Sequence, residues 1–477
     1  QALTIASEID DRQGEAGILN NLAVTYASLG QYPRASELFQ QRLAIARKIG
    51  DRQGEAIALT GLGNTYFAQK QPQQVIEVYQ KALAIAREIG NRDGESGILN
   101  NLGGAYRDLG EYEQAIELQQ QSLAIDREIG DRQGESISLA SLGTTYLALK
   151  QYQRAIEFFQ RSLTLAREVG DRQGEGIVLN NLGGTYLASG NAVAAEAPLS
   201  EAIQVYESLR PGLADDQKVS IFDTQASAYR LLQQSLVAQG KMEQALEVAE
   251  RGRARAFVEL LAAKQATNNQ PTSVNPLTIA EIKQIAREQN ATLVQYSLVS
   301  NLEKKESVYI WVIKPTGEIA FRQVPLTPDN PSPEIAQTSP APGKTRGVSV
   351  LDNWVTQPQF ALRGQPQPSD SRANDASKLT FAAHPALIRR QLKQLHQILI
   401  EPIADLLPSN PDDHVIFIPQ GSLFFVPFPA LRGANGQYLI ERHTIRMAPS
   451  NQVLALTRQQ RQKLGTQSLM TKGTNAL

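Results

Sequence analysis

Histidine, the side chain that most often acts as a general acid or base, occurs only four times in this 477-residue chain. The chain contains no cysteine, which excludes a thiolate nucleophile, a disulfide and a thiolate zinc site within these residues. Ser422 follows a glycine, but Gln-Gly-Ser-Leu-Phe lacks the second glycine of a nucleophile elbow. His414 and His443 flank predicted strands, and we interpret them as structural or surface residues. Asp412 and Asp413 read as a solvated loop pair. We therefore expect no catalytic residue, no metal site and no cofactor.

Asparagine is the polar residue whose spacing suggests binding. It recurs as adjacent pairs 80 residues apart, and the intervening copies carry an Asn or Thr one turn further on: Asn20, Asn21, Asn64, Asn100, Asn101, Thr144, Asn180 and Asn181. Asparagine is unfavourable inside helices, and its amide both donates and accepts hydrogen bonds. We expect these side chains to line a concave groove that holds a peptide or protein partner. The alternative is hydrogen bonding between neighbouring helices.

The asparagines follow a longer internal repeat. The sequence Gly50-Asp51-Arg52-Gln53-Gly54-Glu55 returns every 40 residues, with copies that end at Glu15, Glu95, Glu135 and Glu175. A fixed period of this size is typical of a solenoid.

Two helices are predicted in each copy. In the second copy the helical spacing of apolar residues predicts one buried stripe: Ile57, Leu59, Leu62 and Tyr66. Pro72 suits the first turn of the following helix. Gly90 is predicted to end that helix, and Asn91 to cap the next one, as aspartate does in the other copies.

A small residue recurs in the middle of the first helix of each copy: Ala23, Gly63, Gly103, Gly143 and Gly183. A glycine there costs about 1 kcal/mol relative to alanine. Its repetition predicts close packing, and we expect small residues of the second helix, such as Val75 and Ala115, to lie opposite.

The composition limits the classes of partner that we expect. The net charge of −1 combines an acidic repeat region with a basic remainder. A nucleic-acid-binding stripe would be more basic and more sustained, so no nucleic acid is expected. No run of eighteen apolar residues exists, and no membrane partner is expected. A chain without cysteine fits a reducing compartment, and we expect a cytoplasmic protein of unknown oligomeric state.

Beyond the repeats the pattern changes. A polar stretch is read as a linker, and Thr278 with Glu281 forms a capping box for a helix that ends near Gln289. Strands are predicted at 291–299, 307–313, 318–324 and 414–419, and a helix at about 388–403. The proline-rich residues between them are expected to be a mobile insertion. Strands alternating with helices indicate an α/β domain.

The first part resembles the tetratricopeptide repeats. That family's pattern is present as Leu62-Gly63, Tyr66, Val75, Tyr79 and Ala82. Other copies depart from it, since Gln119 and Leu199 replace the aromatic residue. The unit is longer than the usual 34 residues and is similar to a long-helix variety. The resemblance implies a peptide-binding or protein-binding solenoid.

The second part resembles the CHAT domain, a caspase-like domain found with such repeats in cyanobacteria. The resemblance lies in five segments, at 250–256, 418–423, 426–431, 438–441 and 448–450. It implies a peptidase with a His in a His-Gly segment and a Cys in a Ser-Ala-Cys-Glu-Thr segment. None of the four histidines, His384 and His396 included, precedes a glycine. No catalytic residue is therefore carried over. We expect only the leading half of the domain, no enzyme as given, and a caspase-like cysteine peptidase as the full-length parent.

We expect a tetratricopeptide solenoid followed by a partial α/β caspase-like domain. The solenoid is a partner-binding sensor that regulates the attached domain; the alternative is a non-enzymatic scaffold with a remnant domain. The expected divisions are the tail of a truncated repeat at 1–10, five repeats at 11–210, a degenerate sixth repeat at 211–263, a linker at 264–277 and the CHAT-like part at 278–477, with the insertion at about 325–377.

Overall fold

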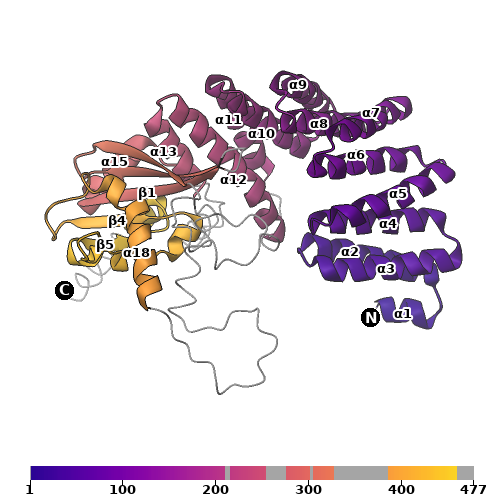
Figure 1. Ribbon diagram of the computed structural model, residues 1–477, viewed down its shortest axis with the longest axis horizontal. Helices are drawn as coiled ribbons and strands as arrows, with labels where there is room; N and C mark the ends of the chain where they lie inside the picture. Colours follow the sequence, from indigo (N-terminus) through magenta and orange to yellow (C-terminus); the bar gives the residue numbers. More distant parts are fainter. Residues whose placement is uncertain (1, 210–214, 254–274, 301–304, 327–384, 459–477) are drawn as a thin grey trace, which may run out of the picture. The chain divides into compact units, whose positions relative to one another are not determined.

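The computed structural model describes residues 2–209, 215–253, 275–300, 305–326 and 385–458 (Figure 1). The chain divides into two compact units, Gln1–Ile221 and Phe222–Leu477. Most of the predicted linker and of the predicted insertion lies outside the described residues. The helices of the degenerate sixth repeat, however, are described, and they fall mainly in the second unit.

The first unit is a stack of helical hairpins, in which each helix packs against the next one along the chain (Figure 1). This confirms the predicted solenoid. The helices are α1 (Ala2–Glu8), α2 (Arg12–Ser28), α3 (Tyr32–Ile49), α4 (Arg52–Ala68), α5 (Pro72–Glu88), α6 (Arg92–Leu109), α7 (Tyr112–Ile129), α8 (Arg132–Ala148), α9 (Tyr152–Glu168), α10 (Arg172–Ala188) and α11 (Ala192–Leu209).

The repeated Gly-Asp-Arg-Gln-Gly-Glu segment separates one hairpin from the next. Gly50 has a φ of 72°, a left-handed conformation that suits glycine, and it ends α3. Asp51 then caps α4, since its carboxylate accepts a hydrogen bond of 2.8 Å from the backbone N–H of Gly54. Asn91, Asp131 and Asp171 cap the corresponding helices in the same way. The capping prediction is confirmed.

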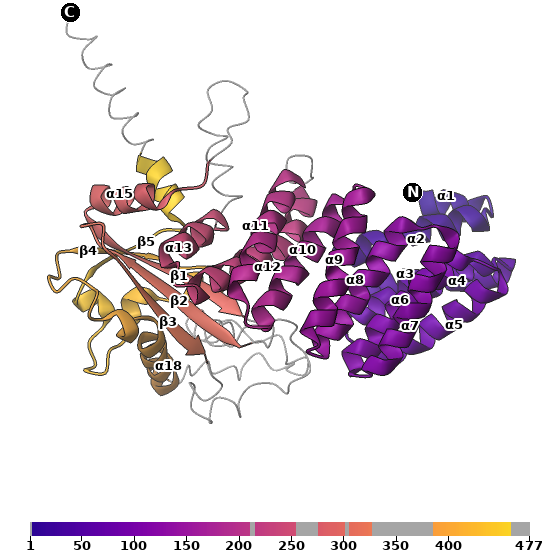
Figure 2. The ribbon, with the colours of Figure 1, turned by 90° about the horizontal axis from the view of Figure 1, so that it is seen from above.

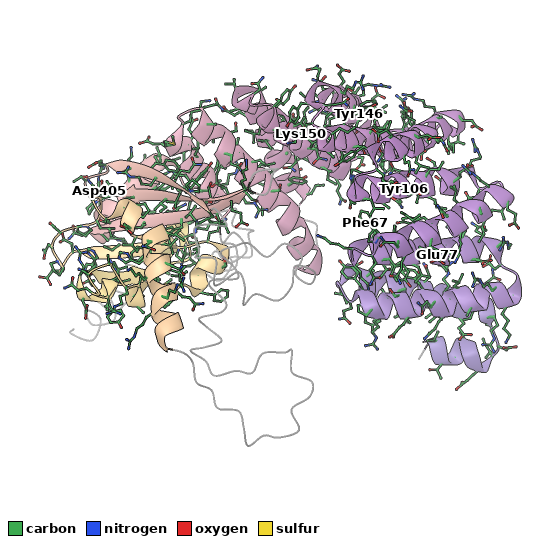
Figure 3. All side chains as sticks on the ribbon, viewed as in Figure 1. Phe67, Glu77, Tyr106, Tyr146, Lys150 and Asp405 are labelled. Carbon is green, nitrogen blue, oxygen red and sulfur yellow. The ribbon has the colours of Figure 1, made fainter. Side chains whose placement is uncertain are left out.

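The last residue of the segment joins neighbouring repeats. The buried carboxylate of Glu95 accepts hydrogen bonds from Arg87 of the preceding helix at 2.7 Å and from Arg92 at 2.5 Å. Arg92 also donates to Glu128 at the end of α7, the second helix of its own hairpin, at 2.5 Å. The same joint surrounds Glu55 and Glu135. By contrast, Glu77, which is labelled in Figure 3, forms an exposed pair with Lys81. Burial alone would raise the pKa of Glu95, but the arginine hydrogen bonds outweigh it and lower that pKa.

The mid-helix glycines face large side chains. A β-carbon at Gly143 would come within 2.8 Å of the ring of Phe159, and one at Gly183 would come within 2.4 Å of Leu199. At Gly103 the three nearest atoms also include the carbonyl oxygen of Ala115, one of the predicted small residues, at 3.0 Å. The predicted close packing is thus present. At most of these glycines, however, the residue that requires it is a large one, sixteen positions further along the chain.

One repeat departs from its neighbours in the core. Asp126 is buried at a position where neighbouring copies have alanine, at Ala86 and Ala166. It accepts hydrogen bonds from Ser96 and, at 2.6 Å, from Ser138. Burial raises the pKa of Asp126, although these hydroxyls partly oppose the increase.

The second unit contains a five-stranded mixed sheet in the order β3-β2-β1-β4-β5. Pairing is antiparallel between β1, β2 and β3, and parallel between β1, β4 and β5. The elements of this unit are α12 (Asp215–Ala238), α13 (Met242–Arg251), α15 (Ile279–Gln289), β1 (Ala291–Ser300), β2 (Glu306–Ile313), β3 (Ile319–Leu326), α18 (Pro385–Leu399), a 3-10 turn (Glu401–Ile403), β4 (His414–Ile418) and β5 (Thr444–Met447).

Helices cover both faces of this sheet (Figure 2). On one face Tyr296 and Phe417 pack in a core with Leu395 of α18. On the other, the indole N–H of Trp311 donates to the backbone carbonyl of Met242 in α13 at 3.0 Å. Strand β1 is therefore buried on both faces, since its consecutive residues from Ala291 to Ser297 are all buried. The sheet with helices confirms the predicted α/β character.

Candidate partner-binding groove

A cavity of about 710 Å³ lies in the first unit and is lined mainly by α2, α4 and α6. Three of the predicted groove residues lie on its wall: Asn20, Asn64 and Asn101. They come from three consecutive repeats, as the 40-residue period implies. Their neighbours on the wall include Val24, Ile57 and Ile98. The cavity thus combines amides with aliphatic side chains.

The amide of Asn64 is held in a defined orientation. Its Oδ1 accepts a hydrogen bond of 2.5 Å from the hydroxyl of Tyr79 and a longer one, of 3.4 Å, from Nδ2 of Asn101. Burial raises the pKa of Tyr79, so that its hydroxyl stays protonated and can donate even at alkaline pH. The contact between Asn64 and Asn101 joins two repeats. The alternative interpretation, hydrogen bonding between neighbouring helices, therefore also applies to this pair.

Asn20 is bound within its own hairpin, where its Oδ1 accepts from the guanidinium of Arg42. Arg42 is buried, and burial lowers its pKa. This contact leaves the amide nitrogen of Asn20 as the group with hydrogen-bonding capacity at the cavity wall.

The other predicted residues do not line this cavity. Thr144 donates to the carbonyl of Ala140 in its own helix at 2.9 Å. Asn21 is exposed, and Asn181 is half-buried. Asn100 and Asn180 each have a buried amide oxygen that accepts no hydrogen bond within the described part of the chain.

The predicted buried stripe of α4 requires one correction. Leu59 and Leu62 are buried, but Ile57 is 41% exposed and lies on the cavity wall. Ile57 precedes Asn64 by seven residues, two helical turns, and therefore shares its helix face. That spacing is the signal in the sequence that identifies Ile57 as a groove residue. Val24 on α2 is likewise exposed at the cavity.

Charge is sparse on this wall. Asp93 is the one ionisable acidic or basic side chain among the residues that line the cavity, apart from the phenol of Tyr32. Neither lysine nor arginine is part of the lining. Such a wall suits a segment that presents backbone amides and aliphatic side chains, rather than one with several carboxylates.

The residues considered for catalysis do not assemble into a site. Ser422 lies in a short 3-10 turn, His396 in α18 and His414 at the start of β4, while His384 lies outside the described residues. Burial lowers the pKa of His396 and of His443. Within the described ranges, no three His, Asp or Glu side chains gather as a metal site. The same ranges contain no helix long and apolar enough to cross a membrane.

Comparison with known proteins agrees with this architecture. A tetratricopeptide-repeat family model matches residues 14–88, 94–168 and 143–208, and a CHAT domain model matches residues 389–476. Tetratricopeptide repeat protein 28 of mouse is 28% identical over 334 residues, which cover 55% of this chain and 13% of the relative. The human protein is 29% identical over 341 residues, 56% of this chain and 14% of the relative. The chain thus matches only about one seventh of the length of these relatives.

Among solved structures, BtubC from P. vanneervenii has a TM-score of 0.42 and 19% identity, covering 52% of this chain and 97% of that one. Tetratricopeptide repeats form scaffolds for protein–protein interaction. The two family models alone identify the N-terminal part of the chain as a run of tetratricopeptide repeats and residues 389–476 as a match to the CHAT domain.

Proposed function

We propose that the repeats bind a protein or peptide segment in the cavity between α2, α4 and α6, and that this binding regulates the part of the chain that matches the CHAT domain. The observation that carries the proposal is the pair Asn64 and Asn101, two amides from neighbouring repeats on one cavity wall. Amides can bond a peptide backbone in either direction. The exposed side chain of Ile57 beside them offers an apolar contact.

The wall also indicates the chemistry of the occupant. Because Asp93 carries the wall's only full charge at neutral pH, a run of acidic residues would be repelled and would find no cation to pair with. We expect an extended segment with uncharged, aliphatic side chains. Thr144, Asn180 and Asn181 belong to the proposed groove as contacts of a longer partner that continues past the cavity.

The test is selection of 12-residue peptides from a random display library on the full chain. The selected peptides are then measured against three variants. Asn101→Ala and Ile57→Asp should each weaken binding about tenfold or more, a loss of about 1.4 kcal/mol. Val193→Asp is the control, because Val193 in α11 is exposed and does not line the cavity.

Two results would contradict the cavity as the binding site. One is a library that yields no enriched peptide. The other is a set of peptides that bind Ile57→Asp as tightly as the wild type, or that lose as much affinity with Val193→Asp. Thermal unfolding of each variant checks that the solenoid is intact, because a matching loss of melting temperature would assign Asn101 a structural role.

A non-enzymatic scaffold is the second candidate function. It is favoured by the sequence itself, which offers no cysteine for a caspase-like nucleophile. In this case the repeats bind their partner but the CHAT-matching part does not cleave peptides. Under either function we propose a cytoplasmic location, on the ground that a chain without cysteine fits a reducing compartment.

A further inference from the structure

We propose that helix α13 is a structural part of the CHAT-matching unit, and that Glu250 and Arg253 at its end position the segment after β4 and the start of the helix at residues 451–458. Neither residue lies within the stretches matched by the two family models, which leave 209–388 unassigned. This inference rests on the proposed function in one respect: it identifies the contacts through which the CHAT-matching part would be regulated.

Arg253 forms hydrogen bonds at the point where the parallel pairing of β1 with β4 ends. Strand β4 ends at Ile418, while its neighbour β1 continues to Ser300. Nη1 of Arg253 donates to the carbonyl oxygens of Ile418 at 3.2 Å and Pro419 at 2.6 Å, and Nη2 donates to the carbonyl of Tyr296. The guanidinium thus supplies donors to carbonyls at the end of β4 and on β1. The fork geometry of arginine suits this task, since one side chain reaches three carbonyls.

Glu250 binds the start of the last described helix. Its Oε1 accepts from the backbone N–H of Gln452 at 2.9 Å, and its Oε2 accepts from Nδ2 of Asn451 at 3.0 Å. A carboxylate at a helix N-terminus satisfies free N–H groups and interacts favourably with the helix dipole. Asn451 also donates to Oε1 of Gln295 in β1 at 2.6 Å. One side chain therefore connects α13 to β1 through a buried amide.

The two charged groups depend on each other. Glu250 is 1% exposed and Arg253 is 4% exposed, so neither is solvated by water. Attraction between the two charges partly opposes the effect of burial on the pKa of each, so loss of one charge removes part of the compensation for the other. The hydrogen bonds of both side chains require that α13, β4 and the helix at 451–458 keep their present arrangement.

Helix α13 also contacts other layers of the unit. Glu243 pairs with Lys283 of α15 at 2.7 Å, and Glu247 accepts from the backbone N–H of Ile279 at 2.5 Å. The preceding helix α12 begins before residue 221, where the two compact units divide, and continues into the second unit. A displacement of α13 would therefore have to break the contacts of Glu250 and Arg253 with the CHAT-matching segment.

Hydrogen exchange of the full chain tests this role. In Arg253→Gln we expect exchange to rise about tenfold or more at 296–300 and 417–423, while β2 and β3 stay within about twofold of the wild type. In Glu250→Gln the rise should be centred on 451–455. Glu243→Gln is the matched control on the same helix, because it removes only an exposed ion pair, and it should leave these segments unchanged.

Arg253→Lys provides a second variant in case Arg253→Gln does not fold. It keeps the positive charge but not the planar fork, and we expect a smaller rise at the same residues. The role is overturned if Arg253→Lys and Arg253→Gln leave 417–423 unchanged, or if exchange rises equally in β2 and β3. Peptide binding to the repeats is measured separately. A failure to select any peptide would contradict the proposed function and leave the exchange result as it stands.

Discussion

Gly63 lies directly against the ring of Tyr79, so that a β-carbon at residue 63 would come within 2.3 Å of Cε1. Tyr79 is buried, and its hydroxyl is bonded to Asn64 on the cavity wall. The glycine therefore permits the tyrosine to reach the groove. A single close contact links the packing of the hairpin to the orientation of a proposed partner-binding amide.

Replacement of that glycine tests the packing. We expect Gly63→Ala to lower the free energy of unfolding by about 1–3 kcal/mol, because the added methyl group must displace a buried ring. Gly104→Ala is the control, since nothing lies within 4 Å of a β-carbon there. It should raise stability by up to about 1 kcal/mol through helix propensity. Denaturant unfolding measures the free energy of unfolding of both variants. An equal change in the two would refute the steric explanation.

The repeat joint gives a second prediction. Glu95→Gln should lower the free energy of unfolding by about 1–3 kcal/mol at pH 7, because it weakens two charge-assisted hydrogen bonds to arginine. The pKa of Glu95 is lowered in the folded state, so its contribution is present above its ordinary pKa and is lost as the pH falls through the lower folded value.

Unfolding curves at a series of pH values measure this loss. The difference between wild type and Glu95→Gln should shrink below about pH 4. Glu77→Gln serves as the control, because Glu77 forms only an exposed pair with Lys81 and should not change the midpoint measurably. A difference that persists unchanged at low pH would contradict an ionised Glu95 as its source.

Asp126 predicts the opposite pH dependence. Asp126→Ala should raise the free energy of unfolding by about 1–3 kcal/mol at pH 7, because it removes a buried carboxylate that has hydroxyl partners but no cation. The raised pKa means that the folded protein binds a proton more readily than the unfolded one. Wild-type stability therefore increases as the pH falls through the raised pKa toward the ordinary value.

The stability that Asp126→Ala gains over the wild type should accordingly become smaller as the pH falls. Thermal unfolding of both proteins at pH 7 and pH 5 measures this difference. Ala86→Asp is the matched control, since it places a carboxylate at the equivalent position of the preceding repeat, where Ala56 and Ile98 offer no hydroxyl. It should destabilise the chain strongly. An advantage that grows at low pH would mean that Asp126 is ionised and stabilising.

The division of the chain makes a fourth prediction, for native-state hydrogen exchange in increasing denaturant. The amides of α13 should become exchangeable together with those of β1 and β4, because Trp311 and Arg253 bind the α13 region to the sheet. Exchange of α13 together with α10 and α11 would instead show that it behaves as a sixth repeat of the solenoid.

The repeats are the most predictable part of the fold, because each copy contains the residues that end one helix and begin the next. Gly50 and Asp51 are adjacent in sequence to the helices they end and begin, so local reasoning identifies them. The prediction that Ile57 is buried in the core of its repeat is wrong. Its spacing from Leu59 and Leu62 suggested a core position, whereas its spacing of seven residues from Asn64 places it on the cavity wall.

Long-range contacts were beyond local reasoning. Residues 250–256 carry part of the resemblance to the CHAT domain, but the partners of Glu250 and Arg253, Asn451 and Pro419, lie far away along the chain. Strand β5 was not predicted either. It has only four residues, Thr444–Met447, and most are exposed, so it carries no alternating apolar pattern; its pairing with β4 defines it.

The near identity of the joints also affects how such a chain can change in evolution. Arg47 and Arg87 occupy equivalent places in successive joints, so an in-frame loss of residues 52–91 would bring Arg47 against Glu95 and rebuild the same interface. Unequal recombination between copies of the gene segment can therefore lengthen or shorten the solenoid while keeping the arginine–glutamate joint between repeats. The unique contacts of Glu250 and Arg253 allow no such exchange, and they fix which hairpin must remain last.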